Sequence, residues 1–98
     1  MRFIIFAEPK FQAPPDQLSR LIDGSLEWNS RYREHLQEFG LFPGGGGFAL
    51  VNVPDEATLN EMVVRHPFAF FSDIQAIPFV DGETGWQQLR EAAQALGG

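Results

Sequence analysis

Both faces of the predicted β-strands are apolar, which limits the folds open to this chain. Successive side chains of a strand point to opposite faces. In the segment Arg2–Glu8, Phe3, Ile5 and Ala7 point to one face and Ile4 and Phe6 point to the other, so both faces are hydrophobic. The segments Phe48–Val53 and Asp73–Val80 show the same pattern. An antiparallel sheet that meets water on one side carries polar residues on that side. The sheet must therefore be covered on both faces.

Apolar residues recur at helical spacing in three other segments. They predict helices from Gln17 to about Glu34–Leu36, from Pro54 to Arg65, and from Thr84 to Leu96. The order β-α-β-β-α-β plus a C-terminal helix predicts an α+β, ferredoxin-like fold, in which helices cover one face of a four-stranded antiparallel sheet. Because the chain has helices for one face only, we expect a second copy to cover the other, in a homodimer or higher oligomer.

The second strand is the least obvious element. Gly40 is typical of a helix C-terminus, which would extend the first helix to Phe39. However, the strand Phe48–Val53 follows four glycines, Gly44–Gly47, and needs a partner across that turn. We therefore predict that the second strand begins near Gln37. The glycines are interpreted as a hairpin turn or bulge, because a phosphate-binding loop needs a following Lys-Ser/Thr and a helix.

Composition excludes several classes of function. The chain has 98 residues, enough for one domain spanning 1–98, and its net charge is -6 without any cluster of Lys and Arg. We expect no nucleic acid and no membrane as partner, because both attract basic surfaces. The chain has no cysteine, which excludes thiolate catalysis and Cys-based metal sites. No signal or membrane-spanning segment is apparent, so we expect a cytoplasmic protein.

Polar side chains interrupt the apolar stripe of the first helix. At about 100° per residue, the stripe passes through Leu18, Ile22, Ser25, Asn29, Tyr32 and Leu36. Ser25 and Asn29 are candidate ligand-binding residues, Tyr32 is a candidate catalytic residue, and Trp28 is a candidate wall of a cavity between this helix and the sheet. The alternative is that these groups pair with one another or with helix carbonyls.

Other titratable residues offer further candidates. His66, at the end of the second helix, is a candidate catalytic group that titrates near neutrality, although histidine also stabilises helix C-termini. His35 is a weaker candidate, and neither histidine has ligands at metal-binding spacing, so we expect no metal. Asp73 next to Ser72 either acts as a base or caps a turn, and Glu8 shares that ambiguity. The cluster Phe68, Phe70 and Phe71 favours an interface over a substrate platform.

The segment Gly44–Asp81 resembles the muconolactone isomerase family of the dimeric α+β barrel superfamily. The shared features are a strand ending Val-x-Val before a helix cap and the Pro-Phe-x-x-Phe-Ser-Asp-Ile segment that leads into the last strand. The resemblance implies a small-molecule pocket between helices and sheet. It also implies movement of a double bond in a lactone by proton transfer, with no cofactor.

The first helix departs from what that chemistry needs. The inner face carries Ser25 and Asn29 rather than a carboxylate, while Glu27 and Glu34 project to the opposite side. Two hypotheses stay open. One is a cofactor-independent isomerase or cyclase that acts on a lactone or polyketide-like molecule by proton transfer. The other is a non-catalytic ligand-binding or interaction protein of the same fold.

Overall fold

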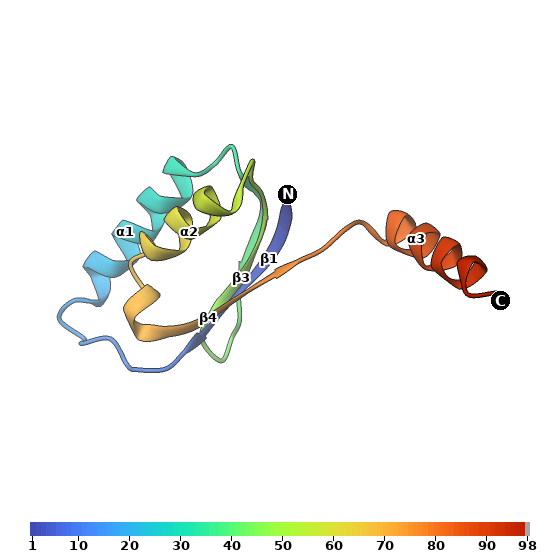
Figure 1. Cartoon of the computed structure of the whole chain (residues 1–98). Coiled ribbons are helices and arrows are strands. Elements are labelled where there is room, and N and C mark those ends of the chain that lie inside the picture. Colours follow the sequence, from blue (N-terminus) through green and yellow to red (C-terminus); the bar gives the residue numbers. More distant parts are fainter. Residues whose placement is uncertain (98) are drawn as a thin grey trace.

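The structure, a computed structural model, describes residues 1–97. Within them, four strands form one antiparallel sheet in the order β2-β3-β1-β4. The strands are β1 (Arg2–Pro9), β2 (Leu36–Leu41), β3 (Gly47–Asn52) and β4 (Ser72–Pro78). The helices of the described chain are α1 (Leu18–Arg31), α2 (Glu56–Val64), the 3-10 turn η1 (Ala69–Phe71) and α3 (Gly82–Ala95) (Figure 1). The predicted α+β class and element order are confirmed.

Some element ends differ from the prediction. Helix α1 ends at Arg31, about one turn early, because the backbone N–H groups of His35 and Leu36 both turn back to the Tyr32 carbonyl, at 2.9 and 3.2 Å. Strand β2 starts at Leu36, one residue before the predicted position. Strand β4 ends at Pro78, two residues early, as expected where proline removes the backbone donor of the ladder.

The register of the sheet sorts its side chains into two faces, because directly opposed residues share a face. Helices α1 and α2 lie on one side of the sheet (Figure 1). The face toward them carries two sets of opposed residues: Phe3 with Val51 and Pro78, and Ile5 with Ala49 and Ala76. The other face, which we call the open face, carries two further sets: Ile4 with Leu50 and Ile77, and Phe6 with Phe48 and Gln75. Both faces are thus mainly apolar, and in the described chain no helix covers the open one.

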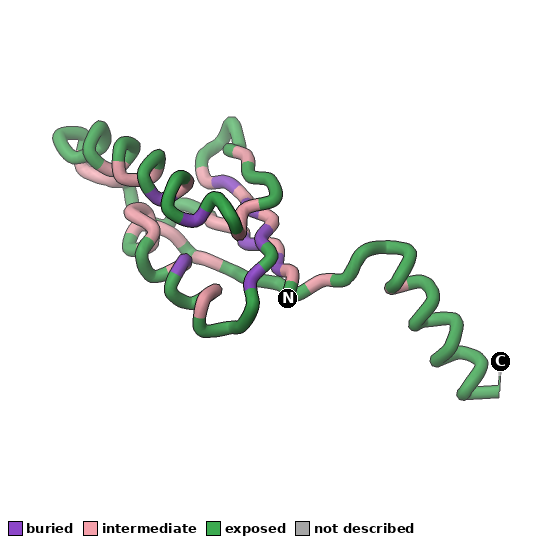
Figure 2. Tube along the Cα trace, turned by 90° about the horizontal axis from the view of Figure 1, so that it is seen from above, coloured by how far each residue is buried: buried purple, intermediate pink, exposed green. Residues whose placement is uncertain are grey.

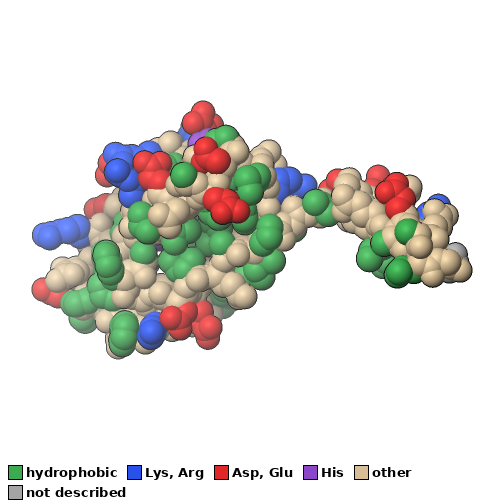
Figure 3. Space-filling model, viewed as in Figure 1, with side chains coloured by type: hydrophobic (Ala, Val, Ile, Leu, Met, Phe, Trp, Pro, Cys, Tyr) green, Lys and Arg blue, Asp and Glu red, His purple; other side chains and the backbone are tan. Residues whose placement is uncertain are grey.

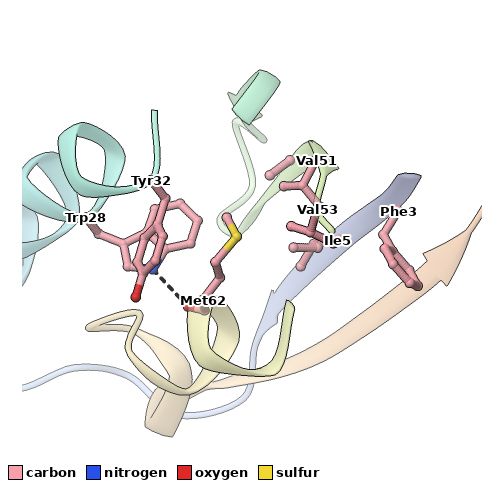
Figure 4. Packing of buried hydrophobic residues seen from close by; sticks show 8 residues of the cluster. Phe3, Ile5, Trp28, Tyr32, Val51, Val53 and Met62 are labelled. Carbon is pink, nitrogen blue, oxygen red and sulfur yellow. Dashed lines mark hydrogen bonds between the residues drawn. The ribbon is translucent and has the colours of Figure 1, made fainter. Parts of the chain in front are cut away.

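The core lies between the sheet and the C-terminal half of α1 with α2 (Figure 4). Its buried members are Phe3, Ile5, Trp28, Tyr32, Ala49, Val51, Val53 and Met62. The predicted stripe on the first helix is wrong at one end, since Leu18 and Ile22 are 43% and 47% exposed. The buried face of α1 is rotated toward Trp28, because the helix packs through its two large aromatic residues.

Gly44–Gly46 form the turn between β2 and β3, as predicted, and Gly47 is the first residue of β3. Gly45 and Gly46 have φ of 106° and 81°, in the left-handed region that favours glycine. A Cβ on Gly46 would also collide with the carbonyl oxygen of Ala7. The turn therefore needs glycine for its conformation and for the close approach of β1.

Helix α3 extends away from the rest of the molecule (Figure 1). The Cα radius of gyration is 16.8 Å and the longest dimension is 61 Å, whereas a compact chain of this length has a radius near 13 Å. Buried positions are confined to the body, and α3 is almost entirely exposed (Figure 2). The predicted apolar stripe of this helix is therefore uncovered in the single chain.

Candidate functional site

Trp28 joins the two helices at the candidate site. Its indole N–H donates a buried hydrogen bond of 2.8 Å to the carbonyl oxygen of Met62 (Figure 4). That carbonyl belongs to the last turn of α2, where helix carbonyls lack intrahelical partners. The bond satisfies this carbonyl and fixes the end of α2 against α1.

Two aromatic side chains lie close to this indole. The ring of Tyr32, one turn further along α1, has its centroid 5.4 Å from that of Trp28. The imidazole of His66, which follows α2, lies edge-on to Trp28 with a centroid distance of 4.7 Å. The structure thus brings together Trp28, Tyr32 and His66, which the sequence placed on two separate helices.

A backbone contact defines which nitrogen of His66 carries the proton. The N–H of Phe68 donates to Nδ1 of His66 at 3.1 Å. Since a backbone N–H can only donate, Nδ1 must supply a lone pair, and the neutral ring then carries its hydrogen on Nε2. Burial lowers the pKa of His66 below its usual value of 6.5, which also favours the neutral ring.

The polar ends of His66 and Tyr32 remain available to a ligand. The Tyr32 ring is buried, and no protein partner of its hydroxyl or of His66 Nε2 is found among residues 1–97. No buried side-chain nitrogen or oxygen of these residues lacks a partner. Both groups must therefore reach solvent. The arrangement offers an O–H and an N–H donor around an indole.

Ser25 and Asn29 are less exposed to a ligand than the sequence suggested. The Ser25 hydroxyl donates to the Leu21 carbonyl at 2.8 Å, which is the alternative of pairing within the helix. Its lone pairs can still accept a hydrogen bond. Asn29 is half-buried on the same side of α1.

The weaker candidates have other partners. His35 contacts the Asn52 carbonyl at 3.3 Å and Glu34 at 3.4 Å, where the chain enters β2. Glu8 and Asp73 face each other across β1 and β4, both exposed, and Asp73 lies 3.6 Å from the ammonium of Lys10. The surroundings of Asp73 are solvent and a cation rather than the apolar rings that would favour a base.

The expected cavity between the first helix and the sheet is occupied by protein. The rings of Trp28 and Tyr32 fill that space against Met62 and the sheet. Two open clefts of the described residues lie elsewhere. One, about 380 Å³, is at the base of α3, and the other, about 400 Å³, lies between α2 and β4. Neither is lined by a residue of α1.

The cleft between α2 and β4 brings in residues that sequence reasoning missed. Its walls are Phe3, Leu59, Val63, Ile74 and Ala76, and its polar groups are Glu56 and Asn60. Glu56 and Asn60 are four residues apart on α2 and therefore lie on the same side of the helix. Ala76 of β4, which has a small side chain, lines the same cleft. That spacing was a signal available in the sequence.

Neither a metal site nor a membrane helix is found in the part of the chain that the structure describes. No three His, Asp or Glu side chains of residues 1–97 are placed to hold a metal ion. None of the described helices has the length and hydrophobicity needed to cross a bilayer.

Comparison with known proteins places the fold. No family model and no curated protein matches the sequence. Among solved structures, muconolactone isomerase aligns with a TM-score of 0.71 at 19% identity, covering 83% of this chain and 90% of its own. The chain has the fold of muconolactone isomerase. The 5-chloro-2-hydroxyhydroquinone dehydrochlorinase (TftG) of Burkholderia phenoliruptrix AC1100, in complex with 2,5-dihydroxybenzoquinone, aligns at 0.66 and 18% identity, covering 86% and 98%.

The predicted resemblance is thereby confirmed for the muconolactone isomerase fold. Both structural neighbours are enzymes that act on small molecules. At 18% and 19% identity, the likeness supports a shared architecture and leaves the reaction of this chain to be argued from its own residues.

Proposed function

We propose that the protein is a cofactor-independent isomerase or cyclase-like protein. Its substrate is a small oxygenated molecule of the lactone or polyketide-like type, bound beside Trp28. The observation that carries the proposal is the contact from the Phe68 N–H to His66 Nδ1, at 3.1 Å. It directs the proton of a neutral imidazole to Nε2, on the ring that lies edge-on to Trp28.

His66 serves as a hydrogen-bond donor in this proposal. Its Nε2–H binds a carbonyl oxygen of the substrate and stabilises the negative charge that develops there when an adjacent C–H is broken. A neutral imidazole can take this role, because its Nε2–H donates while Nδ1 accepts from the Phe68 N–H. The lowered pKa keeps His66 in this form at neutral pH.

Tyr32 is the acid and base of the pair. Its hydroxyl is the available O–H of the cluster, since the Ser25 hydroxyl is engaged by the Leu21 carbonyl. The tyrosine hydroxyl gives its own proton to one carbon of the substrate while its oxygen takes the proton from another carbon, so that the residue ends with one O–H bond as it began. A double bond moves, no atom is gained or lost, and no cofactor is consumed. Trp28 forms the wall of the site, and Asn29 and the lone pairs of Ser25 are secondary contacts.

Substitution separates catalysis from folding. Muconolactone and 2,5-dihydroxybenzoquinone are suitable probes. The first gives muconolactone isomerase its name, and the second is bound in the dehydrochlorinase structure. We expect muconolactone isomerisation, followed by ultraviolet absorbance, to fall at least 100-fold in Tyr32→Phe, with binding by calorimetry retained. Asp73→Asn serves as a control and should leave the rate unchanged. Wild-type turnover that survives Tyr32→Phe would refute the assignment.

A non-catalytic ligand-binding protein is the second candidate. It is favoured by the lack of a carboxylate beside Trp28, since Asp73 is exposed next to Lys10 and Glu34 is exposed next to His35. In that case the probes bind and neither is converted. Binding that is weakened by His66→Asn, without turnover in the wild type, would support this candidate.

We also propose that the open face of the sheet associates with a second copy. Ile77 is 39% exposed there, and its neighbours Ile4, Phe6, Phe48 and Leu50 are half-buried. An isologous interface needs the same surface from each copy, which a flat apolar sheet face provides. The expected solution species is a dimer, with twice the mass of the 11.0 kDa chain.

A further inference from the structure

The segment that joins α2 to η1 is a tight turn that begins at His66. The backbone N–H of Ala69 donates to the His66 carbonyl at 3.0 Å, which closes a four-residue turn with Pro67 and Phe68 at its centre. Phe68 has φ of -89° and ψ of 4°, as the third residue of a type I turn does. Proline favours the second position of such a turn, because its ring holds φ near the required value. The sequence His-Pro-Phe-Ala therefore specifies this turn locally.

The His66 side chain occupies the position that asparagine or aspartate takes in many turns. At the first position of a turn, these residues accept a hydrogen bond from the backbone N–H two residues further on. Here His66 Nδ1 accepts from the Phe68 N–H at 3.1 Å, over the same separation in sequence. The imidazole is thus part of the turn, and the orientation of its ring follows from that of the backbone.

The turn is tied to the body at both ends. At its start, the His66 N–H donates to the Val63 carbonyl at 3.2 Å, in the last turn of α2. At its end, the Phe68 carbonyl accepts from the Phe71 N–H at 3.0 Å, and the Phe71 carbonyl accepts from the Lys10 N–H at 2.8 Å, just beyond β1. The backbone on either side of the His66 ring is therefore held in place.

Helix α1 contacts the His-Pro pair through two positions one helical turn apart. The indole of Trp28 lies edge-on to the His66 ring, with a centroid distance of 4.7 Å. Four residues earlier, Gly24 lies against Pro67: a Cβ on Gly24 would be 3.0 Å from Cγ and 3.6 Å from Cβ of the proline ring. Residues four apart lie on the same side of a helix. One face of α1 thus packs against both residues of the pair.

The glycine at position 24 leaves space for the proline ring. Gly24 lies in the middle of α1, where glycine destabilises a helix relative to alanine. A methyl group there would approach Pro67 more closely than ordinary van der Waals contact, so the ring would have to move. Gly85 of α3 differs, because a Cβ there would meet Val80 at an ordinary distance of 3.6 Å. Gly24 therefore allows the close approach of α1 to the turn.

The surroundings of the turn strengthen its hydrogen bonds. Residues 66–69 are half-buried. Hydrophobic side chains form the middle of the face that carries α1 and α2, and most charged side chains lie toward its margins (Figure 3). A hydrogen bond in such a setting competes less with water and is stronger than at an exposed site. The bond from the Phe68 N–H to Nδ1 is therefore suited to hold the imidazole in one orientation.

We propose that Pro67 and Gly24 are positioning residues of the candidate site. Pro67 holds the turn that keeps the Phe68 N–H on His66 Nδ1, and Gly24 gives that turn room beside α1. Together they fix the imidazole ring and present it as an Nε2–H donor. The class of ligand follows, and this step rests on the proposed function. The ligand must offer His66 an acceptor, such as a carbonyl oxygen, because an Nε2 that carries a proton cannot accept from an O–H or N–H group.

Nuclear magnetic resonance tests the positioning role without any ligand. In 15N-labelled wild-type protein at about pH 8, His66 is neutral because its pKa lies below 6.5. We expect a scalar coupling across the hydrogen bond, between the Phe68 amide nitrogen and His66 Nδ1. Pro67→Ala should weaken this coupling and speed hydrogen exchange of the Phe68 amide about ten-fold. Pro15→Ala, in the exposed loop before α1, is the control and should leave both unchanged.

Two further pairs of variants separate this role from a general effect on folding, which circular dichroism monitors. Gly24→Ala should also speed exchange of the Phe68 amide several-fold, whereas Gly85→Ala removes a helical glycine without a close contact and should not. Gly24→Ala decides the question if Pro67→Ala does not fold. His66→Asn keeps an acceptor at the first position of the turn and should keep the Phe68 amide protected, whereas His66→Ala should expose it.

Binding of 2,5-dihydroxybenzoquinone, which carries carbonyl oxygens, tests the consequence for the ligand. We expect Pro67→Ala to weaken this binding several-fold in calorimetry, because a freed imidazole must be ordered again when the ligand binds. Pro15→Ala should bind as the wild type does. The comparison is made at a protein concentration that is the same for every variant.

The outcomes distinguish failure of the positioning role from failure of the proposed function. Absence of the coupling in the wild type, or equal exchange of the Phe68 amide in Pro67→Ala and Pro15→Ala, would overturn the positioning role. Binding and turnover that stay unchanged in Pro67→Ala after the coupling is lost would overturn it too, while the proposed function stands. A wild type that shows the coupling but neither binds nor converts muconolactone or 2,5-dihydroxybenzoquinone would support the positioning of His66 and count against the proposed function.

Discussion

Replacing Trp28 with phenylalanine removes a single buried hydrogen bond and tests how the candidate site is held together. The indole N–H is the partner of the Met62 carbonyl at 2.8 Å, and Met62 has no exposed surface. Phenylalanine keeps an aromatic ring in the core but cannot donate to this oxygen. An unpaired buried carbonyl costs about 1–3 kcal/mol, and the smaller ring adds a cavity cost of about 1 kcal/mol.

We therefore expect Trp28→Phe to lower the free energy of unfolding by about 2–4 kcal/mol. At about 4–8 °C per kcal/mol for a domain of this size, the melting temperature should fall by more than about 8 °C. Urea unfolding followed by circular dichroism measures the change without depending on tryptophan emission. Protein concentration must be held constant, because an oligomer is stabilised by mass action.

The second tryptophan of the chain supplies the matched control. Trp86 is 74% exposed in the single chain and has no such bond to the body. Trp86→Phe should change the stability of the body by less than about 0.5 kcal/mol, as surface substitutions usually do. Equal destabilisation by the two substitutions, or a loss below about 0.5 kcal/mol in Trp28→Phe, would refute the reasoning that this bond fixes α2 against α1.

Two further predictions concern the glycine turn and pH. Gly46→Ala should destabilise the fold by more than about 2 kcal/mol, because a side chain there has an unfavourable φ and meets the Ala7 carbonyl. Gly44→Ala, where nothing lies within 4 Å of the new methyl group, should be nearly neutral in the same denaturation assay. His66 has a pKa below 6.5 in the folded state, so the unfolded chain binds more protons as the pH falls through that value. Stability should therefore decrease from about pH 7 downward until the folded-state pKa is reached, and NMR titration of the His66 ring should give a midpoint below 6.5. His66→Asn, which keeps an acceptor for the Phe68 N–H, should flatten this dependence, and an unchanged slope would contradict the assignment.

The sequence contained enough information for the fold because its strands carry a strong signal. Apolar residues on both faces of Arg2–Glu8 and Phe48–Val53, together with two helices, leave few arrangements of a four-stranded sheet. Strand β2 was found by a topological argument rather than by composition, since Gly47 and its neighbours needed a partner across the turn. The end of α1 was missed by a turn of helix, because the tight turn onto the Tyr32 carbonyl has no distinctive residue.

The candidate site was only partly predictable. Residues 28, 32 and 66 were chosen for their chemistry, and the structure brings them together through a hydrogen bond from the Trp28 side chain to the backbone of α2. A sequence pattern cannot predict which backbone carbonyl accepts a side-chain hydrogen bond, because every residue has a backbone carbonyl. The same limit applies to the Phe68 N–H, whose direction changes the proposed role of His66 from a titrating catalytic group to a hydrogen-bond donor.

Periodicity located the apolar stripe of α3 but not the direction in which the helix extends. A helical pattern gives the positions of Trp86 and Leu89 around the helix axis. It does not give the direction of that axis relative to the sheet. In the structure that axis points away from the body, because Phe79 is tied to Arg2 at the base of the helix.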